Sequence, residues 1–484
     1  MTLQLLDPTL VKDQCYVDGT WIGTPRTEVL DPATGAVLGH VPCFGAAETQ
    51  GAIEAANAAF DGWAAKTAKE RATLIRRWYE RIMAHRDDLA LILTSEQGKP
   101  LAEARGEIEY AAAYVEFYAE EAKRIAGETL PSHRADARIL VLRQPTGVVA
   151  AITPWNFPAA MITRKAAPAL AAGCPIVVKP AGETPLTALA LAELADRAGI
   201  PKGVFNIVTG DAPAIGGVMT QHAAVRLVNF TGSTEIGKLL MRQSASTVKK
   251  VALELGGNAP FIVFDDADLD AAVEGAMVSK YRNMGQTCVC ANRFYVQAGV
   301  HDAFVEKLAA AVARLKVGRG TEPGVTQGPL ISADAVAKVE AHLADAEDKG
   351  GQIILGGRRH ALGGTFFEPT ILTGATAAMR LAREETFGPL APIFRFEDEA
   401  EAIHAANDTE FGLAAYFYAR DIGRIFRVGE ALDYGMVGVN SGLISTELAP
   451  FGGVKESGNG REGSHHGIDE FVDKKYLLLA GLDR

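Results

Sequence analysis

The stretch from Val148 to Lys179 reads VVAAITPWNFPAAMITRKAAPALAAGCPIVVK, and it decides the fold that the sequence predicts. It begins with the apolar run Val148–Ile152 and passes through the loop Pro154–Pro158. A helical stretch then reaches Gly173, and the apolar run Pro175–Lys179 follows. Continuous apolar strands separated by a helix are typical of a parallel sheet that is covered on both faces.

The same alternation continues toward the C-terminus. Thr184 as N-cap with Pro185 behind it predicts a helix start, and Gly199 closes that helix. Further strands are expected at 204–208, 225–230, 260–264, 353–355, 391–396, 413–418 and 436–440, with helices at 301–315, 333–349, 399–407 and 422–432. We therefore predict an α/β fold of two open, doubly wound domains with a seam near 254–257.

The region before this stretch has a different pattern. Residues 1–45 are rich in turns and short strands, and Thr67-Ala-Lys-Glu70 is a capping box that predicts a helix start. The run Arg138–Arg143 stands apart from the other strands. It suits an edge strand or an arm that reaches another subunit, and an ordinary hairpin explains it equally well.

Composition narrows the classes of function. The chain has 484 residues, and its net charge of 48 − 59 = −11 is spread without long acidic or basic runs. Nucleic-acid and anionic-membrane binding are therefore not expected, although a local arginine pair can still bind a small acidic substrate. The longest apolar run, Ala166–Val178, is too short to span a bilayer, and the start of the chain lacks a signal-peptide pattern.

The cysteines argue for a reducing compartment. An odd, sparse set in a long chain is not a disulfide framework, and no pair has zinc-site spacing, so we expect a cytoplasmic protein without a metal centre. The five are Cys15, Cys43, Cys174, Cys288 and Cys290.

One of these cysteines lies in a distinctive setting. Cys288 follows Gly285-Gln-Thr287 and precedes a β-rich run, which places its sulfur on a turn. A thiolate there can attack a carbonyl carbon. The alternative is a small buried side chain, which is what most free cysteines are.

Other segments could bind a nucleotide or act as a base. Lys179–Thr184 and Phe230–Gly237 each leave a strand and enter a helix, where free N–H groups favour phosphate, but neither has the G-x-G-x-x-G fingerprint. Glu254 precedes two glycines and could reach into an interdomain cleft as a general base, although a salt-bridged glutamate is the simpler explanation.

Taken together, these segments resemble the aldehyde dehydrogenase superfamily, in its non-acylating, nicotinamide-dependent form, over essentially the whole chain. The motifs that carry the resemblance are Pro154-Trp-Asn-Phe-Pro158, Lys179-Pro-Ala, Phe230-Thr-Gly-Ser233, Glu254-Leu-Gly-Gly257, Gly285-Gln-Thr-Cys288, Glu384-Glu-Thr-Phe-Gly-Pro389 and Pro450-Phe-Gly-Gly453.

The resemblance implies a role for each catalytic residue. Cys288 attacks the aldehyde, and the Asn156 amide with the Cys288 backbone N–H holds the oxyanion. Hydride then leaves for the nicotinamide ring, and Glu254 activates the water that hydrolyses the thioester. A coenzyme A-acylating reductase would lack that glutamate, a thiol hydrolase would need a histidine beside the cysteine, and a non-catalytic relative would be expected to lose these three residues.

The cofactor residues come from the same resemblance. It implies Lys179 and Glu385 at the riboses, Phe387 beside the nicotinamide, Trp155 and Ser233 near the adenosine–pyrophosphate portion, and Gly182, Gly232 and Leu255 along the cofactor site. NAD-preferring members often carry a glutamate at the position of Gly182. Its absence favours NADP over NAD, because a 2′-phosphate then avoids like-charge repulsion, although Glu183 could still interfere.

For the substrate, stretches such as Met161-Ile-Thr-Arg-Lys165 and Phe411–Arg420 are most similar to bacterial succinate-semialdehyde dehydrogenase. That likeness implies that Arg164, Arg282 and Ser445 hold a substrate carboxylate. Glutarate semialdehyde is one methylene longer, and the sequence does not separate the two substrates. Cys290 is either a redox partner of Cys288 or a packed side chain.

The resemblance also implies how the chain is divided. We expect a cofactor domain at 1–126 and 148–254, a catalytic thiol domain at 255–456, and an oligomerisation arm with a C-terminal segment at 127–147 and 457–484. The arm is expected to pair across subunits in a homodimer or homotetramer.

Overall fold

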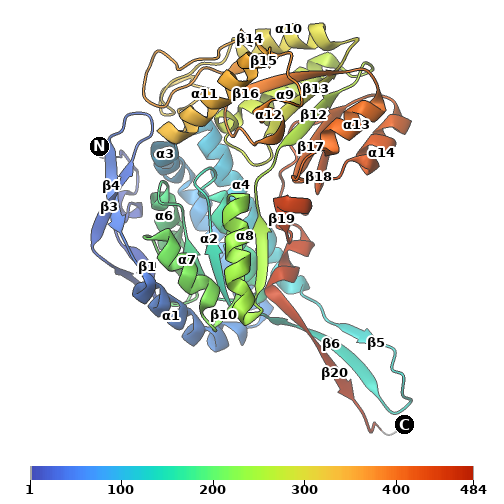
Figure 1. Ribbon diagram of the computed structural model, residues 1–484. Helices are drawn as coiled ribbons and strands as arrows, with labels where there is room; N and C mark the ends of the chain where they lie inside the picture. The colour runs from blue at the N-terminus through green and yellow to red at the C-terminus, as the bar shows by residue number, and fades with distance from the viewer. Residues whose placement is uncertain (1–2, 483–484) are drawn as a thin grey trace.

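The computed structural model describes residues 3–482 and contains two large sheets, each with helices on both faces (Figure 1). The first sheet has eight strands in the order β19 (Gly458–Asn459), β11 (Lys250–Glu254), β10 (Val225–Thr231), β7 (Val148–Ile152), β8 (Ile176–Lys179), β9 (Phe205–Ile207), β1 (Cys15–Val17) and β2 (Thr20–Ile22). The five strands from β11 to β9 are parallel, as the sequence predicted, and the outer strands are antiparallel.

Successive side chains of a strand point to opposite faces of the sheet, and on this sheet both faces are apolar and covered by helices. Val148 and Ala150 pack with residues of α1 and α7, whereas Val149 and Ala151 pack in the larger core that α2 to α6 form on the other face. The helices of this half are α1 (Ala46–Ala64), α2 (Ala68–Ala84), α3 (Arg86–Gln97), α4 (Leu101–Glu121), α5 (Ala160–Ala172), α6 (Pro185–Arg197), α7 (Ala212–Gln221) and α8 (Thr234–Ser244).

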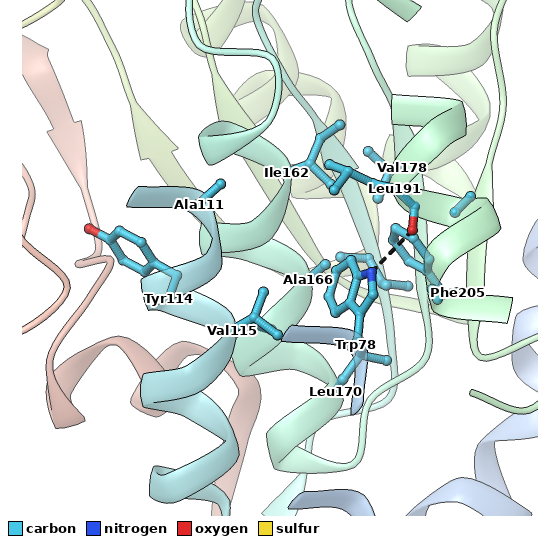
Figure 2. Packing of buried hydrophobic residues seen from close by; sticks show 14 of the residues in the cluster. Trp78, Ala111, Tyr114, Val115, Ile162, Ala166, Leu170, Val178, Leu191 and Phe205 are labelled. Atoms are coloured by element: carbon cyan, nitrogen blue, oxygen red, sulfur yellow. Dashed lines mark hydrogen bonds between the residues drawn. The ribbon is translucent and has the colours of Figure 1, made fainter. Parts of the chain in front are cut away.

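Trp78 of α2 lies at the centre of the larger core (Figure 2). Its indole donates a hydrogen bond to the Leu191 backbone carbonyl at 3.1 Å, and its ring packs against Phe205. A buried indole needs such an acceptor, because an unpaired polar group inside a core is costly. This packing joins α2 to α6 and to the first sheet.

The second sheet has seven strands, in the order β14 (Gln352–Leu355), β15 (Thr370–Thr373), β16 (Leu390–Phe396), β13 (Ala291–Gln297), β12 (Ala259–Val263), β17 (Ala414–Tyr418) and β18 (Met436–Val439). All neighbouring pairs except β14–β15 are parallel. Its helices are α9 (Leu269–Tyr281), α10 (His301–Val312), α11 (Ala333–Asp348), α12 (Arg380–Arg383), α13 (Glu399–Asn407) and α14 (Ile422–Ala431).

Smaller elements complete the fold. The strands β3 (Pro25–Leu30) and β4 (Val37–Pro42) form a hairpin, and the 3₁₀ turns are η1 (Pro8–Leu10), η2 (Ala122–Arg124), η3 (Ala245–Thr247), η4 (Arg282–Gly285), η5 (Lys455–Ser457) and η6 (His465–Phe471). A third sheet of β5 (Glu128–Leu130), β6 (Arg138–Pro145) and β20 (Val472–Leu479) projects from the body (Figure 1). The run that we expected as an edge strand, an arm or part of a hairpin is therefore the central strand of this projecting sheet, and it pairs with β5 in an antiparallel hairpin.

Two expected helix starts have different outcomes. The capping box at Thr67 is present, because Glu70 N donates to the Thr67 hydroxyl and Thr67 N donates to the Glu70 carboxylate. Thr184 occupies the N-cap position of α6, but its hydroxyl makes no capping bond. The carboxylate of Glu96 accepts from Leu186 N and Thr187 N instead, at 2.7 and 2.8 Å.

Candidate active site

The loop that carries Cys288 connects α9 to β13 through η4. Asn283, Met284 and Gly285 have φ of 52°, 57° and 73°, so three successive residues are left-handed. A Cβ on Gly285 would lie 2.2 Å from the Gly388 carbonyl oxygen, which excludes a side chain there. Left-handed non-glycine residues store strain that the surrounding structure must hold, and such strain gathers at functional sites.

Cys288 opens into a cavity of about 350 Å³ between the two large sheets, which we call the cysteine cleft. Its walls include Trp155, Asn156, Gly232, Ser233, Leu255, Cys288, Glu385 and Phe387, which are eight of the residues singled out in the sequence. Phe387 has φ of 54°, and its ring meets Trp155 edge to face at 5.6 Å between centroids. The structure thus gathers motifs that are far apart in the chain.

Two hydrogen-bond donors are available beside the sulfur. One amide hydrogen of Asn156 is bound to the Gln286 carbonyl oxygen at 3.1 Å, which leaves the second for the cleft. The backbone N–H of Cys288 has no hydrogen-bond acceptor within residues 3–482. Unpaired donors next to a nucleophile are what an oxyanion requires.

Glu254 ends β11 next to the cleft, and its side chain is directed elsewhere. Leu255 and Gly256 line the cysteine cleft, whereas the Glu254 carboxyl is buried and neither of its oxygens has a hydrogen-bond partner among residues 3–482. Burial, followed by the negative charge of Glu462, raises the pKa of this carboxyl well above 4.5. A buried carboxyl without a partner is poised to take up a proton.

A cluster of buried charges surrounds Glu254. Glu462 lies 2.5 Å from both Arg164 and Lys165, and these side chains are at most 5% exposed. Burial opposes ionisation, but Arg164 and Lys165 lower the pKa of Glu462 below 4.5. Sequence reasoning missed Lys165 and Glu462. The signal for the lysine was present, because two cations inside the otherwise apolar helix α5 need partners.

The surroundings of Cys288 disfavour the thiolate form. Burial raises the pKa of the Cys288 thiol to about 12, and the positive charge of Arg164 acts in the opposite direction. Attack by this sulfur must therefore be coupled to loss of its proton.

A second, longer cavity of about 950 Å³, which we call the long cleft, runs along the strand ends of the first sheet. It shares Pro154, Trp155, Thr231 and Gly232 with the cysteine cleft, so the two cavities adjoin. Open α/β sheets bind nucleotides at this edge.

The lining of the long cleft fits an anionic ligand. Lys179 is buried, and within the described part of the chain its ammonium donates only to the Pro180 carbonyl oxygen, at 3.0 Å. A Cβ on Gly182 would meet no atom within 4 Å, so space remains there. Where the cysteine cleft adjoins this cavity, Ser233 caps the N-terminus of α8, and free N–H groups there favour phosphate. Glu385 also lines the cysteine cleft, and burial raises its pKa to about 7.

The three residues expected to bind a substrate carboxylate do not all line the same cavity. Arg282 and Ser445 line one cavity of about 290 Å³, which we call the end cavity, together with Phe157. The Arg282 guanidinium lies 5.2 Å from the Phe157 ring centre. Arg164 does not line this cavity, because its guanidinium packs on Phe451 and pairs with Glu462. The structure therefore places one of the two expected arginines with the serine.

Cys290 is fully buried and does not line the cysteine cleft. Its sulfur lies 3.5 Å from the Lys280 ammonium, which also donates to Asn292. A bond to Cys288 would require this sulfur to leave Lys280.

Metal binding and membrane insertion are the remaining classes of function. Within residues 3–482, no three His, Cys, Asp or Glu side chains come together in a group that could hold a metal ion. No helix in the same range is both long and apolar enough to cross a membrane.

A large cavity that adjoins a cysteine and two free donors is the arrangement expected of a nicotinamide-dependent oxidoreductase that works through a thiol. Comparison with known proteins gives the family. The aldehyde dehydrogenase family profile matches residues 21–477, and the chain belongs to that family. It is thus an NAD(P)-dependent aldehyde dehydrogenase, as the motifs predicted.

Similar proteins match over the full length. The chain is 63% identical to a glutarate-semialdehyde dehydrogenase of Pseudomonas aeruginosa, over 99% of this chain and 100% of the relative. It is 62% identical to the NADP-dependent succinate-semialdehyde dehydrogenase of Escherichia coli, with the same coverage. The crystal structure of a Burkholderia pseudomallei succinate-semialdehyde dehydrogenase is 65% identical, with a TM-score of 0.98 over 99% of this chain and 100% of that one.

Proposed function

We propose that the protein oxidises succinate semialdehyde to succinate with NADP as the preferred cofactor. The observation that carries this proposal is the end cavity, which Arg282 and Ser445 line together with Phe157, the neighbour of the cleft-lining Asn156. A guanidinium and a hydroxyl recognise a carboxylate at the far end of a short aldehyde. We assign that role to these two residues, and we assign Arg164 to the buried charges around Glu254.

Each chemical step then has a residue. The Cys288 sulfur loses its proton and adds to the aldehyde carbon, and Asn156 and the Cys288 N–H donate to the resulting oxyanion. Loss of hydride leaves a thioester on the sulfur. Glu254 turns into the cleft and takes a proton from water, whose oxygen attacks the thioester and releases the acid.

The bound cofactor supplies the hydride acceptor. Lys179, Ser233, Gly182, Gly232 and Glu385 would hold it, and the buried ammonium of Lys179 with the open space at Gly182 supports a 2′-phosphate there. Leu255 and Phe387 would shield the nicotinamide end from water, and Trp155 would lie nearer the pyrophosphate, where the two cavities adjoin. NAD remains the alternative cofactor.

Glutarate semialdehyde is the alternative substrate, and a relative at 63% identity carries that name. One methylene contributes only about 1–3 kcal/mol of discrimination. The discriminating measurement is the ratio of kcat/KM for the two semialdehydes, and a ratio that favours the longer one by tenfold or more (about 1.4 kcal/mol) would reassign the substrate.

The assembly and the domain roles are part of the same proposal. We assign cofactor binding to 1–126 and 148–254, thiol chemistry to 255–456, and subunit pairing to 127–147 with 457–484, in a homodimer or homotetramer. The five cysteines are unpaired in the structure, which supports work in the reducing cytoplasm.

One assay tests the core of the proposal. NADPH formation from succinate semialdehyde, without coenzyme A, is expected for the wild type and is expected to vanish in Cys288→Ala. A requirement for coenzyme A would instead identify an acylating enzyme, and activity retained in Cys288→Ala would remove the thiol from the mechanism.

A further inference from the structure

A closed set of buried hydrogen bonds lies behind the Asn156 loop, on the side away from the cysteine cleft. Lys99 Nζ donates to the Asn156 carbonyl oxygen at 2.7 Å, and Asn283 Nδ2 donates to the same oxygen at 3.0 Å. Gln97 Nε2 donates to Asn283 Oδ1, and Lys99 N donates to Gln97 Oε1, at 3.0 and 2.9 Å. We call these four residues, Gln97, Lys99, Asn156 and Asn283, the hydrogen-bond ring.

Glu107 extends the ring to the start of α5. Its carboxylate accepts from Lys99 Nζ at 2.6 Å through one oxygen, and from Ala159 N at 2.9 Å and Ala160 N at 3.3 Å through the other. Lys99 and Glu107 together therefore hold the main chain on both sides of Phe157 and Pro158. The Lys99 ammonium also lies 3.9 Å from the Phe157 ring centre.

Such a charge pair is expensive to bury. The side chains of Lys99 and Glu107 are 0% and 1% exposed. Replacing a buried ion pair with apolar residues of similar size is often neutral or stabilising, so fold stability is a poor reason for this one. Buried pairs are retained where they fix a particular arrangement of the chain.

The arrangement that the ring fixes is the one the chemistry needs. Asn283 begins the strained run before Cys288, and its amide also donates to the Gln286 carbonyl oxygen. The Asn156 side chain donates to that same oxygen. The ring thereby sets the separation between the Asn156 amide and the Cys288 sulfur, and an oxyanion donor displaced by about 1 Å can cost about 10²-fold in rate.

We propose that Lys99, held by Glu107 and Gln97, is a positioning residue that aims the Asn156 amide at the oxyanion formed on Cys288. This inference rests on the proposed function, in which Asn156 is the oxyanion donor. Lys99 lines the end cavity beside Arg282 and Ser445 but not the cysteine cleft, and it acts on the oxyanion donor through the Asn156 main chain.

The test is a double-mutant cycle read in two reactions. The first reaction is the single-turnover burst of NADPH with succinate semialdehyde, which requires the oxyanion donor. The second is alkylation of Cys288 by iodoacetamide, which forms no oxyanion. Lys99→Met is expected to slow the burst about 10- to 100-fold, since losing an oxyanion donor outright costs about 10²–10³-fold. Alkylation is expected to change by less than about threefold, because the sulfur is untouched.

In the Asn156→Ala background, Lys99→Met is expected to slow the burst no further, because its effect passes through Asn156. The inference is overturned if the two substitutions slow the burst multiplicatively in the double variant. It is also overturned if Lys99→Met slows the burst and the alkylation by the same factor. Lys250→Met is the matched control, since Lys250 also donates to a carboxylate and a main-chain carbonyl, those of Asp473 and Val472, and it should leave the burst unchanged.

A second variant keeps the inference testable if Lys99→Met is unfolded. If Lys99→Met does not fold, Gln97→Met breaks the ring without removing a charge and must show the same selective loss of the burst, or the inference fails. The single variants also separate the two proposals. An unchanged burst in Asn156→Ala would refute its oxyanion role. A slow burst in Asn156→Ala with a normal burst in Lys99→Met would refute the positioning role alone.

Discussion

Replacing Arg282 with methionine should separate recognition of the acid end from the chemistry at the sulfur. Arg282 lines the end cavity with Ser445, and it has no ion pair with a carboxylate in residues 3–482. Its charge is therefore available to a ligand. A hydrogen bond to a charged group contributes about 1.5–3 kcal/mol, which corresponds to roughly a 10- to 150-fold loss of kcat/KM for succinate semialdehyde.

The assay compares two aldehydes through the absorbance of NADPH. Butanal has the same number of carbons as succinate semialdehyde and no carboxylate, so Arg282→Met should change its kcat/KM by less than about twofold. The loss with the acid aldehyde should fall mainly on KM, because the reacting groups are intact.

Arg164→Met is the matched comparison. Arg164 is 2% exposed and pairs with Glu462, so its removal should destabilise the fold by roughly 3–5 kcal/mol and affect both aldehydes equally. The opposite result would be a lower kcat/KM for succinate semialdehyde alone in Arg164→Met, with equal changes for both aldehydes in Arg282→Met. That result would refute the assignment of the end cavity.

Four further predictions concern charge. Glu254→Gln should lower kcat by about 10²–10⁴-fold yet keep a stoichiometric NADPH burst; loss of the burst would contradict its role in hydrolysis. Because burial holds the pKa of Glu254 well above 4.5, thioester hydrolysis should rise as pH climbs through that raised pKa, and a flat wild-type profile would argue against this base. Glu462→Gln leaves two buried cations without a carboxylate and should cost roughly 3–5 kcal/mol in urea unfolding, whereas a loss below about 1 kcal/mol would contradict the pairing. Lys179→Met should raise KM for NADP at least tenfold more than KM for NAD (about 1.4 kcal/mol), and an unchanged ratio would remove the 2′-phosphate contact.

Local patterns in the sequence predicted much of the fold. The apolar runs of β7 and β8 and the capping box at Thr67 lie where the structure has them, because strand burial and helix capping depend on near neighbours. The place of β6 between β5 and β20 could not be predicted in this way. Its partner β20 lies more than 300 residues further on and carries no periodic signal of its own.

In the site, too, local motifs were predictive and long-range contacts were not. Motifs predicted that Asn156, Cys288 and Glu385 would share a cleft, and the structure brings them together. The direction of a side chain was not predictable. Arg164 turns toward Glu462, which is 298 residues away, and Lys99 is a lysine that sequence reasoning would leave at the surface.

The edge of the first sheet has a consequence for synthesis of the chain. β19 pairs with β11 at Leu253 and Glu254, so residues made near the end of translation cover a strand made two hundred residues earlier. Until the ribosome releases Gly458 and Asn459, β11 remains an open edge that can pair with another nascent chain. A premature stop before residue 458 should therefore yield a product that aggregates, even though every residue of the cysteine cleft has already been made.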